Sequence, residues 1–249
     1  MTRIRYGLKL WSKNSNLIDH AENLIRTEMF QYLELTIIPD TDITPFIDRN
    51  IPFIVHMTPD IYGVNLGDCK AGDLNHRIIH LCCEWADQLK ATYIILHPGF
   101  GNLDCVLGIL EGYDDPRILI ENMPKKGTCG EKMVGFLPDQ IHLICQEKFG
   151  FCLDLNHAIK AALSLKMDYR QIIEEFLLLH PTIFHLSDGS LHRQIDEHLS
   201  FGEGSYPLPY LMNCLKRQEN PYVTLETPRA SGSLNDDLNN LKELQRYAQ

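Results

Sequence analysis

Short, largely apolar runs alternate with longer segments along the whole chain. Eight of the short runs are rich in β-branched and aromatic residues, which predicts strands. They span residues 4–10, 32–38, 52–56, 93–97, 118–121, 151–154, 182–186 and 222–226. The longer segments repeat apolar residues with the helical period, most clearly at 74–89, 138–148, 169–179, 206–217 and 234–247. Strands that alternate with helices of this length predict βαβ units and a parallel sheet.

Eight such units in 249 residues predict one closed (β/α)₈ barrel, an α/β TIM barrel that spans residues 1–249 as a single domain. No Gly-rich dinucleotide fingerprint follows the first strand, so nothing favours an open doubly wound sheet. Residues 40–49 are too few for a full second helix. Residues 189–204 form a long, polar connection from strand to helix, and in barrels such loops build the active site.

Composition limits the classes of partner. The formal net charge of −10 argues mildly against a simple basic groove for nucleic acid, although divalent ions in a cleft would invert the field there. No apolar run is long enough to span a bilayer, and the N-terminus lacks the apolar core of a signal peptide. The eight cysteines are scattered without a C-x-x-C pair, so we expect reduced thiols rather than disulfides. These features predict a soluble, cytoplasmic protein with no membrane partner.

Six consecutive predicted strands carry a histidine or a carboxylate at or next to their last residue, where a barrel gathers its catalytic groups. These residues are His56, His97, Glu121, Asp154, His185 and Glu226. Each follows an apolar run inside the barrel wall, where an unpaired charge is costly and a metal ion removes that cost. His157 follows Asp154 by three residues, and Asp196 and His198 lie in the long loop after the seventh strand. Mixed histidine and carboxylate ligands favour zinc, manganese or iron over a thiolate site.

Taken one at a time, these residues have ordinary structural explanations. A strand-end histidine is more often a hydrogen-bonded core residue than a ligand, and a lone Glu121 or Glu226 could close a salt bridge. The remaining histidines fit that explanation, namely His20, His76, His80, His142, His180 and His192. The barrel topology nevertheless brings the nine groups to one end, which favours a multinuclear metal site.

The ordered set of motifs resembles the endonuclease IV family of apurinic/apyrimidinic endonucleases, within the xylose isomerase-like barrels. The resemblance extends from about Pro52 to Pro228. Its motifs are His97-Pro98-Gly99, Asp154-x-x-His157, Asp196-x-His198 leading into Gly202-Glu203-Gly204, and Leu225-Glu226-Thr227-Pro228. The resemblance implies a monomeric enzyme with three metal ions, normally zinc with manganese as the alternative, and DNA with abasic sites as its partner.

The resemblance also implies a role for each residue of the set. It assigns His56, His97 and Glu121 to the first ion, and Glu121, Asp154, His185 and Glu226 to the second. It assigns His157, Asp196 and His198 to the third. Glu121 and Glu226 are the implied catalytic residues in hydrolysis of the phosphodiester on the 5′ side of an abasic nucleotide, because a hydroxide shared by two ions is nucleophilic at neutral pH. Tyr62, after the third strand, and Arg229, after the eighth, are the expected substrate contacts.

Two loops depart from the family pattern. Family members bend DNA with an arginine after the second strand and a Tyr-Leu wedge after the third. Here residues 39–42 are acidic without arginine, and Gly63 follows Tyr62 where the family has leucine. Inserted apolar side chains normally offset the cost of unstacking a duplex. We therefore expect cleavage of single-stranded or destabilised DNA relatively better than in the family, or a substrate other than duplex DNA.

Two further functions stay open. A sugar isomerase or epimerase of the same superfamily acts on a small-molecule sugar and holds one ion with residues at the positions of Glu121, Asp154, His185 and Glu226. Such an enzyme needs neither the pair of His56 and His97 nor the Asp-x-His motif. The third function is a barrel that binds metal without turnover, which the complete set of nine ligand types disfavours.

Overall fold

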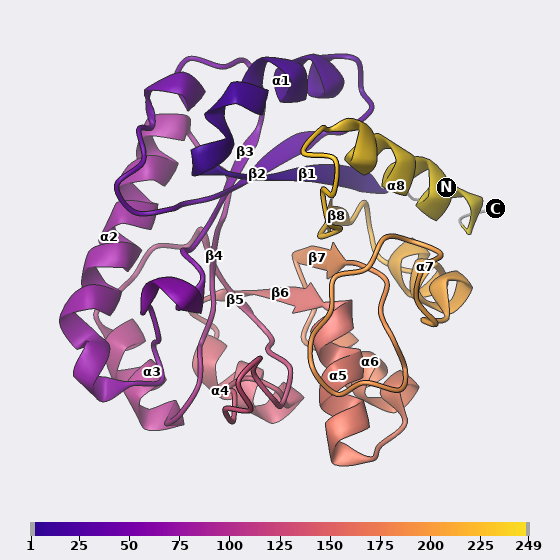
Figure 1. Ribbon diagram of the computed structural model, residues 1–249. Helices are drawn as coiled ribbons and strands as arrows, with labels where there is room; N and C mark the ends of the chain where they lie inside the picture. Colours follow the sequence, from indigo (N-terminus) through magenta and orange to yellow (C-terminus); the bar gives the residue numbers. More distant parts are fainter. Residues whose placement is uncertain (1–2, 248–249) are drawn as a thin grey trace.

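The eight predicted strands close into a parallel barrel in which each strand pairs with its neighbours in chain order (Figure 1). The computed structural model describes residues 3–247. The strands are β1 (Arg5–Trp11), β2 (Tyr32–Thr36), β3 (Phe53–His56), β4 (Ile94–Leu96), β5 (Ile118–Glu121), β6 (Gly150–Asp154), β7 (Ile183–Leu186) and β8 (Tyr222–Leu225). The (β/α)₈ TIM barrel expected from the alternating pattern is thereby confirmed.

Helices surround the barrel (Figure 1). They are α1 (Ile18–Arg26), α2 (Gly72–Leu89), α3 (Leu103–Glu111), α4 (Pro138–Cys145), α5 (Leu155–Leu165), α6 (Tyr169–Leu177), α7 (Leu208–Lys216) and α8 (Asn235–Arg246). Short 3₁₀ segments lie at η1 (Ser12–Leu17), η2 (Thr44–Phe46), η3 (Asp60–Tyr62) and η4 (Cys69–Ala71). Between residues 40 and 49 only η2 forms, as expected from the short connection. Within residues 3–247, no helix has the length and apolar character needed to cross a membrane.

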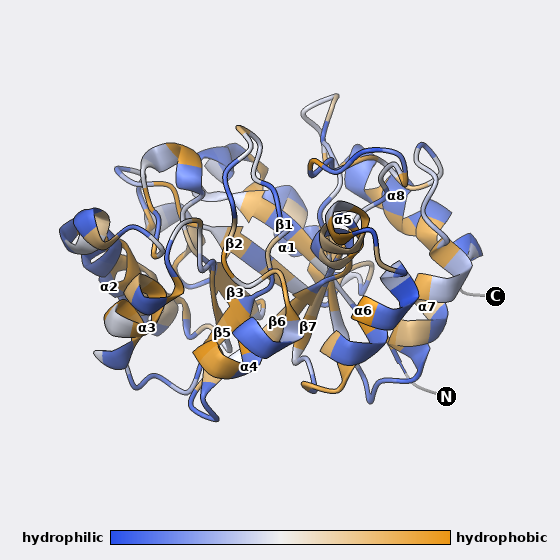
Figure 2. Ribbon diagram, turned by 90° about the horizontal axis from the view of Figure 1, so that it is seen from below, coloured by the Kyte–Doolittle hydropathy of each residue, from blue (hydrophilic) through white to orange (hydrophobic). Residues whose placement is uncertain are grey.

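The buried residues of the helices and strands match the hydrophobic patterns from which these elements were predicted. In α1 the buried residues are Ile18, Ala21, Leu24 and Ile25, the one-sided spacing that packs a helix against a sheet. Every residue of β2, β3, β4, β5 and β7 is buried, as expected for strands covered on both faces. Figure 2 shows the same arrangement, since the central strands are mostly orange and the surrounding helices alternate orange and blue.

The interior of the barrel is built in layers, because residues two apart on a strand point to the same face. An apolar layer consists of Tyr32, Ile54, Ile95, Leu119, Cys152 and Ile183. Two positions later, towards the carboxyl ends of the same strands, stand Glu34, His56, His97, Glu121, Asp154 and His185. In β1 a Cβ on Gly7 would lie 2.3 Å from Cε2 of Tyr32, so glycine is required there, and Lys9 follows two positions later. An apolar floor therefore supports a layer of ionisable side chains.

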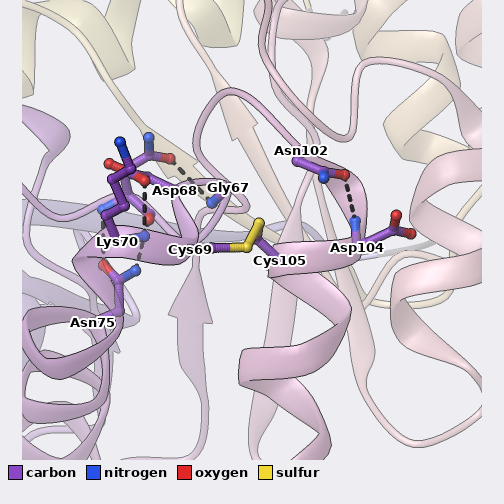
Figure 3. The surroundings of a disulfide bond; sticks show 9 residues. Gly67, Asp68, Cys69, Lys70, Asn75, Asn102, Asp104 and Cys105 are labelled. Carbon is purple, nitrogen blue, oxygen red and sulfur yellow. Dashed lines mark hydrogen bonds between the residues drawn. A yellow bond between two sulfur atoms is a disulfide. The ribbon is translucent and has the colours of Figure 1, made fainter.

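A disulfide joins Cys69 in η4 to Cys105 in α3 (Figure 3). This bond corrects the expectation of reduced thiols throughout, while the other cysteines are free: Cys82, Cys83, Cys129, Cys145, Cys152 and Cys214. The bonded pair is 36 residues apart and meets only because β3 and β4 are neighbours in the barrel, so spacing along the chain gave no indication of it. The disulfide ties the connection that follows β3 to the helix that follows β4.

Candidate metal centre

The first group of candidate ligands gathers where β3, β4 and β5 end. Nε2 of His56 and Nε2 of His97 lie 3.3 and 3.0 Å from Oε2 of Glu121. One ligand atom from each residue lies within 4.8 Å of the other two, a separation that one divalent ion can bridge. The barrel therefore brings together the three residues expected at the first ion.

A second group shares Glu121 with the first. Nδ1 of His185 lies 3.3 Å from Oε2 of Glu121 and 3.1 Å from Oε1 of Glu226. Asp154 ends β6 and caps α5, since its Oδ1 accepts the backbone N–H of His157 at 2.7 Å. Its Oδ2 lies 3.7 Å from Nδ1 of His157, and its carboxylate gathers with His157 and His198, so the structure places Asp154, expected at the second ion, beside two residues expected at the third. Glu121 thus contacts both groups, as a bridging ligand would.

The third group joins α5 to the long loop after β7. Nε2 of His157 and Nε2 of His198 each lie 3.5 Å from Oδ2 of Asp196. His198 also lies 3.3 Å from Oε2 of Glu226, so the third group contacts the second. The nine residues singled out from the sequence consequently form one continuous cluster at the carboxyl ends of the strands.

The ring nitrogens of three histidines test whether this cluster fits a metal. Nδ1 of His56 lies 2.9 Å from the carbonyl of Met57, and Nδ1 of His157 lies 2.8 Å from the carbonyl of Asn122. Nε2 of His185 lies 3.0 Å from a carboxylate oxygen of Glu34. When these nitrogens donate, the other nitrogen of each neutral ring aims a lone pair at a carboxylate of the cluster. Lone pairs that face carboxylates need a cation between them, so the donor set fits divalent ions.

Burial and neighbouring charges shift the pKa values of several residues in this cluster. Burial raises the pKa of Asp154 to about 6, against the opposing effect of His157. Burial opposes protonation of His198, yet Asp196 and Glu226 raise the pKa of this imidazole to about 9. The pKa of Asp196 falls to about 2 despite burial, because His198 and His157 stabilise its charge. Carboxylates here require positive charge from imidazolium or from metal, and metal binding would release the imidazolium protons.

Two ionisable residues of this layer were missed in the sequence. Lys9 of β1 forms ion pairs with Glu226 and, at 3.0 Å, with Glu34 of β2. Glu34 is fully buried. The alternation of strand residues between two faces could have revealed them, because each residue interrupts an apolar run on the inward face of its strand. The search for strand-end groups overlooked both, since β1 and β2 continue for two residues beyond them.

Side chains of α5 hold the loop that carries Asp196 and His198 in place. Lys160 of α5 is fully buried, and its Nζ donates to the carbonyls of Ser190 and Arg193 at 2.9 and 3.1 Å. The same ammonium pairs with Glu197 at 2.9 Å. Nδ2 of Asn156 donates to Oδ1 of Asp196. These bonds hold an irregular segment in one conformation, which a metal site on a loop requires.

A cavity of about 630 Å³ opens over the cluster and is lined by His56, His97, Glu121, His157, Asp196, His198 and Glu226 among others. Arg229 also lines the cavity, and a bidentate pair with Asp237 at 2.7 and 2.8 Å fixes its guanidinium there. Tyr62 lies outside the lining, on η3, where it is exposed beside the more exposed Ile61. Of the two expected substrate contacts, the structure therefore brings only Arg229 to the cavity.

Known proteins share this sequence pattern and this fold. The family model described as "Xylose isomerase-like TIM barrel" matches residues 46–248. A probable endonuclease 4 of Metamycoplasma arthritidis is 28% identical over 191 residues, which cover 68% of each chain. Matches to three further probable endonucleases 4 cover 55%, 59% and 58% of those chains.

Two solved structures show the same fold. A D-tagatose 3-epimerase-like protein superposes with a TM-score of 0.71 at 17% identity, covering 98% of this chain and 97% of that one. Endonuclease IV from Thermus thermophilus superposes with a TM-score of 0.66 at 20% identity, covering 98% of both chains. At these identities the likeness shows the barrel alone.

Proposed function

The chain belongs to the xylose isomerase-like TIM barrel family, and we propose that it is a metal-dependent phosphodiester hydrolase resembling endonuclease IV. Its substrate in this proposal is DNA that contains abasic sites, cleaved on the 5′ side of the damaged nucleotide. The curated relatives named probable endonuclease 4 support a hydrolase. The assignment of nine ligands to three ions, zinc or manganese, is part of the proposal.

One observation carries this proposal over the isomerase. The set of Glu121, Asp154, His185 and Glu226 would satisfy a single-ion isomerase, but two further groups adjoin it. His56 and His97 contact Glu121 on one side, and His198 contacts Glu226 on the other. An enzyme that binds one ion has no need of these additional ligand groups, whereas phosphodiester cleavage uses ions at both the attacking and leaving oxygens.

Each group of residues has a defined part in that reaction. Divalent ions, when bound, lower the pKa of water and stabilise charge that develops on phosphate oxygens. Glu121 would hold the first and second ions at a fixed separation, because one of its oxygens faces histidines of both groups. Asp196 and His198 would hold the third ion beside Glu226. Arg229 lies at the cavity wall, where a substrate phosphate would share its guanidinium with Asp237.

Metal content decides between these functions. Protein purified without chelator is expected to carry about three divalent ions per chain, against about one for an isomerase. Removing them with chelator should lower the melting temperature by about 10 °C, since ions at a thousand times their Kd contribute about 4 kcal/mol. Elemental analysis and thermal unfolding measure both. Protein that holds no metal and melts at the same temperature in chelator would contradict the proposal, and one ion together with turnover of a ketose would establish the isomerase.

Substrate form is a separate prediction. Gly63 has a positive φ of 84° at the end of η3 and offers no side chain to insert into a duplex. Unstacking costs a few kcal/mol per step, and a single strand avoids most of that cost. We expect an abasic oligonucleotide to be cleaved at least as fast single-stranded as duplexed, at one fixed salt concentration. A strong duplex preference would contradict this, and its loss in Ile61→Ala would identify the exposed Ile61 as the inserting side chain.

A further inference from the structure

Six of the nine residues assigned to ions lie at the ends of strands, and none of the nine lies on β1 or β2. These two strands nevertheless present Lys9 and Glu34 in the same inner layer, next to the second group of ligands. A buried lysine–glutamate pair gives little net stability compared with apolar residues of similar volume. Its place beside the cluster therefore needs another explanation than stability of the barrel.

Glu34 is the centre of this pair's contacts. One of its carboxylate oxygens, Oε2, accepts hydrogen bonds from Nε2 of His185 at 3.0 Å and from the hydroxyl of Thr224 at 2.6 Å. The other, Oε1, lies 3.0 Å from Nζ of Lys9. The hydroxyl of Tyr32 lies 2.9 Å from that of Thr224 and extends the network to the apolar floor. Tyr32, Glu34, His185 and Thr224 are buried, and Lys9 lines the cavity, so the whole network lies inside the barrel.

The network reaches two members of the second ligand group by different routes. The bond to Glu34 favours the tautomer of His185 that carries its proton on Nε2, so the lone pair of Nδ1 faces Glu121 and Glu226. Lys9 pairs with Oε1 of Glu226, the oxygen that also lies 3.1 Å from that Nδ1. One contact thus fixes the tautomer of the imidazole, and the other fixes the orientation of the carboxylate.

We propose that Glu34 and Lys9 are positioning residues that hold His185 and Glu226 in the geometry of the second ion. The inference rests on the proposed function, because it requires an ion at the second group. A carboxylate that accepts from a ligating imidazole raises the basicity of that ligand, and loss of such a partner weakens metal binding 10–100-fold. Lys9 compensates the charge that Glu34 buries, so the pair adds no net charge to the site.

The test measures zinc binding alone, without nucleic acid. Wild-type protein, Glu34→Gln and Glu28→Gln are stripped of metal and loaded with Zn²⁺. Each is then titrated with increasing concentrations of a chromophoric chelator. Glu28 is the matched control, because its side chain is 78% exposed and pairs with Arg3 on the surface. We expect Glu34→Gln to release one ion about 10–100-fold more readily than wild type, with the remaining ions unchanged. Glu28→Gln should match wild type.

A second comparison separates positioning from general loosening of the barrel. His185→Ala should lose the same ion, and adding Glu34→Gln to it should change nothing further, because the ligand that Glu34 positions is already gone. If Glu34→Gln does not fold, Thr224→Val removes the 2.6 Å bond to Glu34 while both charges stay, and a smaller weakening of the same ion is expected.

The outcomes distinguish this inference from the proposed function. Wild type that binds three ions, with Glu34→Gln retaining all of them at wild-type affinity, would overturn the inference alone. Zinc loss that adds to that of His185→Ala would also overturn it, since it would indicate a structural effect elsewhere. Wild type that binds no zinc would overturn the proposed function and this inference with it.

Discussion

Glu121→Gln is expected to lower turnover of an abasic oligonucleotide by about 10³-fold or more, which corresponds to about 4 kcal/mol of transition-state stabilisation. Oε2 of Glu121 lies 3.0–3.3 Å from nitrogens of His56, His97 and His185. An amide in its place either directs N–H groups at lone pairs or offers a neutral, weaker ligand oxygen. The first and second ions would then lose their shared ligand. Single-turnover kinetics with saturating enzyme measure the chemical step directly.

Glu111→Gln is the matched control for this variant, because Glu111 ends α3 at an exposed position. Near-ultraviolet circular dichroism should show both variants folded, and only Glu121→Gln should lose activity. A Glu121→Gln enzyme that cleaves at nearly the wild-type rate would show that the bridging assignment is wrong. Metal analysis of the same preparation tells whether lost activity follows from lost ions.

The layered interior explains why the barrel and its ligands could be predicted from sequence. Apolar runs between helical segments mark strands, and parallel strands that close in chain order place their carboxyl ends together. His56, Glu121 and Asp154 were therefore placed at one end without any contact being known. That these residues share ions was expected only from the family resemblance, because barrel topology places the strand ends together without fixing the side-chain contacts between them.

Other features could not be predicted because they depend on contacts distant in sequence. Cys69 and Cys105 meet through adjacent strands, so local spacing carried no information about the disulfide. The helix α5 begins directly after Asp154, which serves both as the end of β6 and as the cap of the helix. The end of the strand at Asp154 was predicted, but the helix that begins at the next residue was not among the helical segments that the pattern marked most clearly. The burial of Lys160 could not be predicted either, because a lysine in a helical segment normally marks the solvent-exposed face.

Lys160→Met should therefore be the most damaging substitution outside the ligand set. It would remove the ammonium that pairs with the carboxylate of Glu197 and donates to the carbonyls of Ser190 and Arg193. Breaking a buried ion pair by removing one partner costs about 3–5 kcal/mol. Because Glu197 is partly exposed, we expect the lower end of that range, which corresponds to a melting temperature about 10 °C lower in a chain of this size. The loop that carries Asp196 and His198 should loosen, and the third ion should be released first during titration with chelator. Calorimetry and elemental analysis measure the two effects.

Two comparisons make this prediction specific. Lys242→Met, at an exposed position of α8, should change neither the melting temperature nor the metal content. Lys160→Met combined with Glu197→Gln should recover part of the lost stability, because the uncompensated charge is gone and the two effects are coupled. The double variant should still release the third ion early, since the bonds from Lys160 to the carbonyls of Ser190 and Arg193 are still lost. Equal metal retention in Lys160→Met and wild type would show that the loop keeps its geometry without this lysine, held by remaining contacts such as that of Asn156 with Asp196.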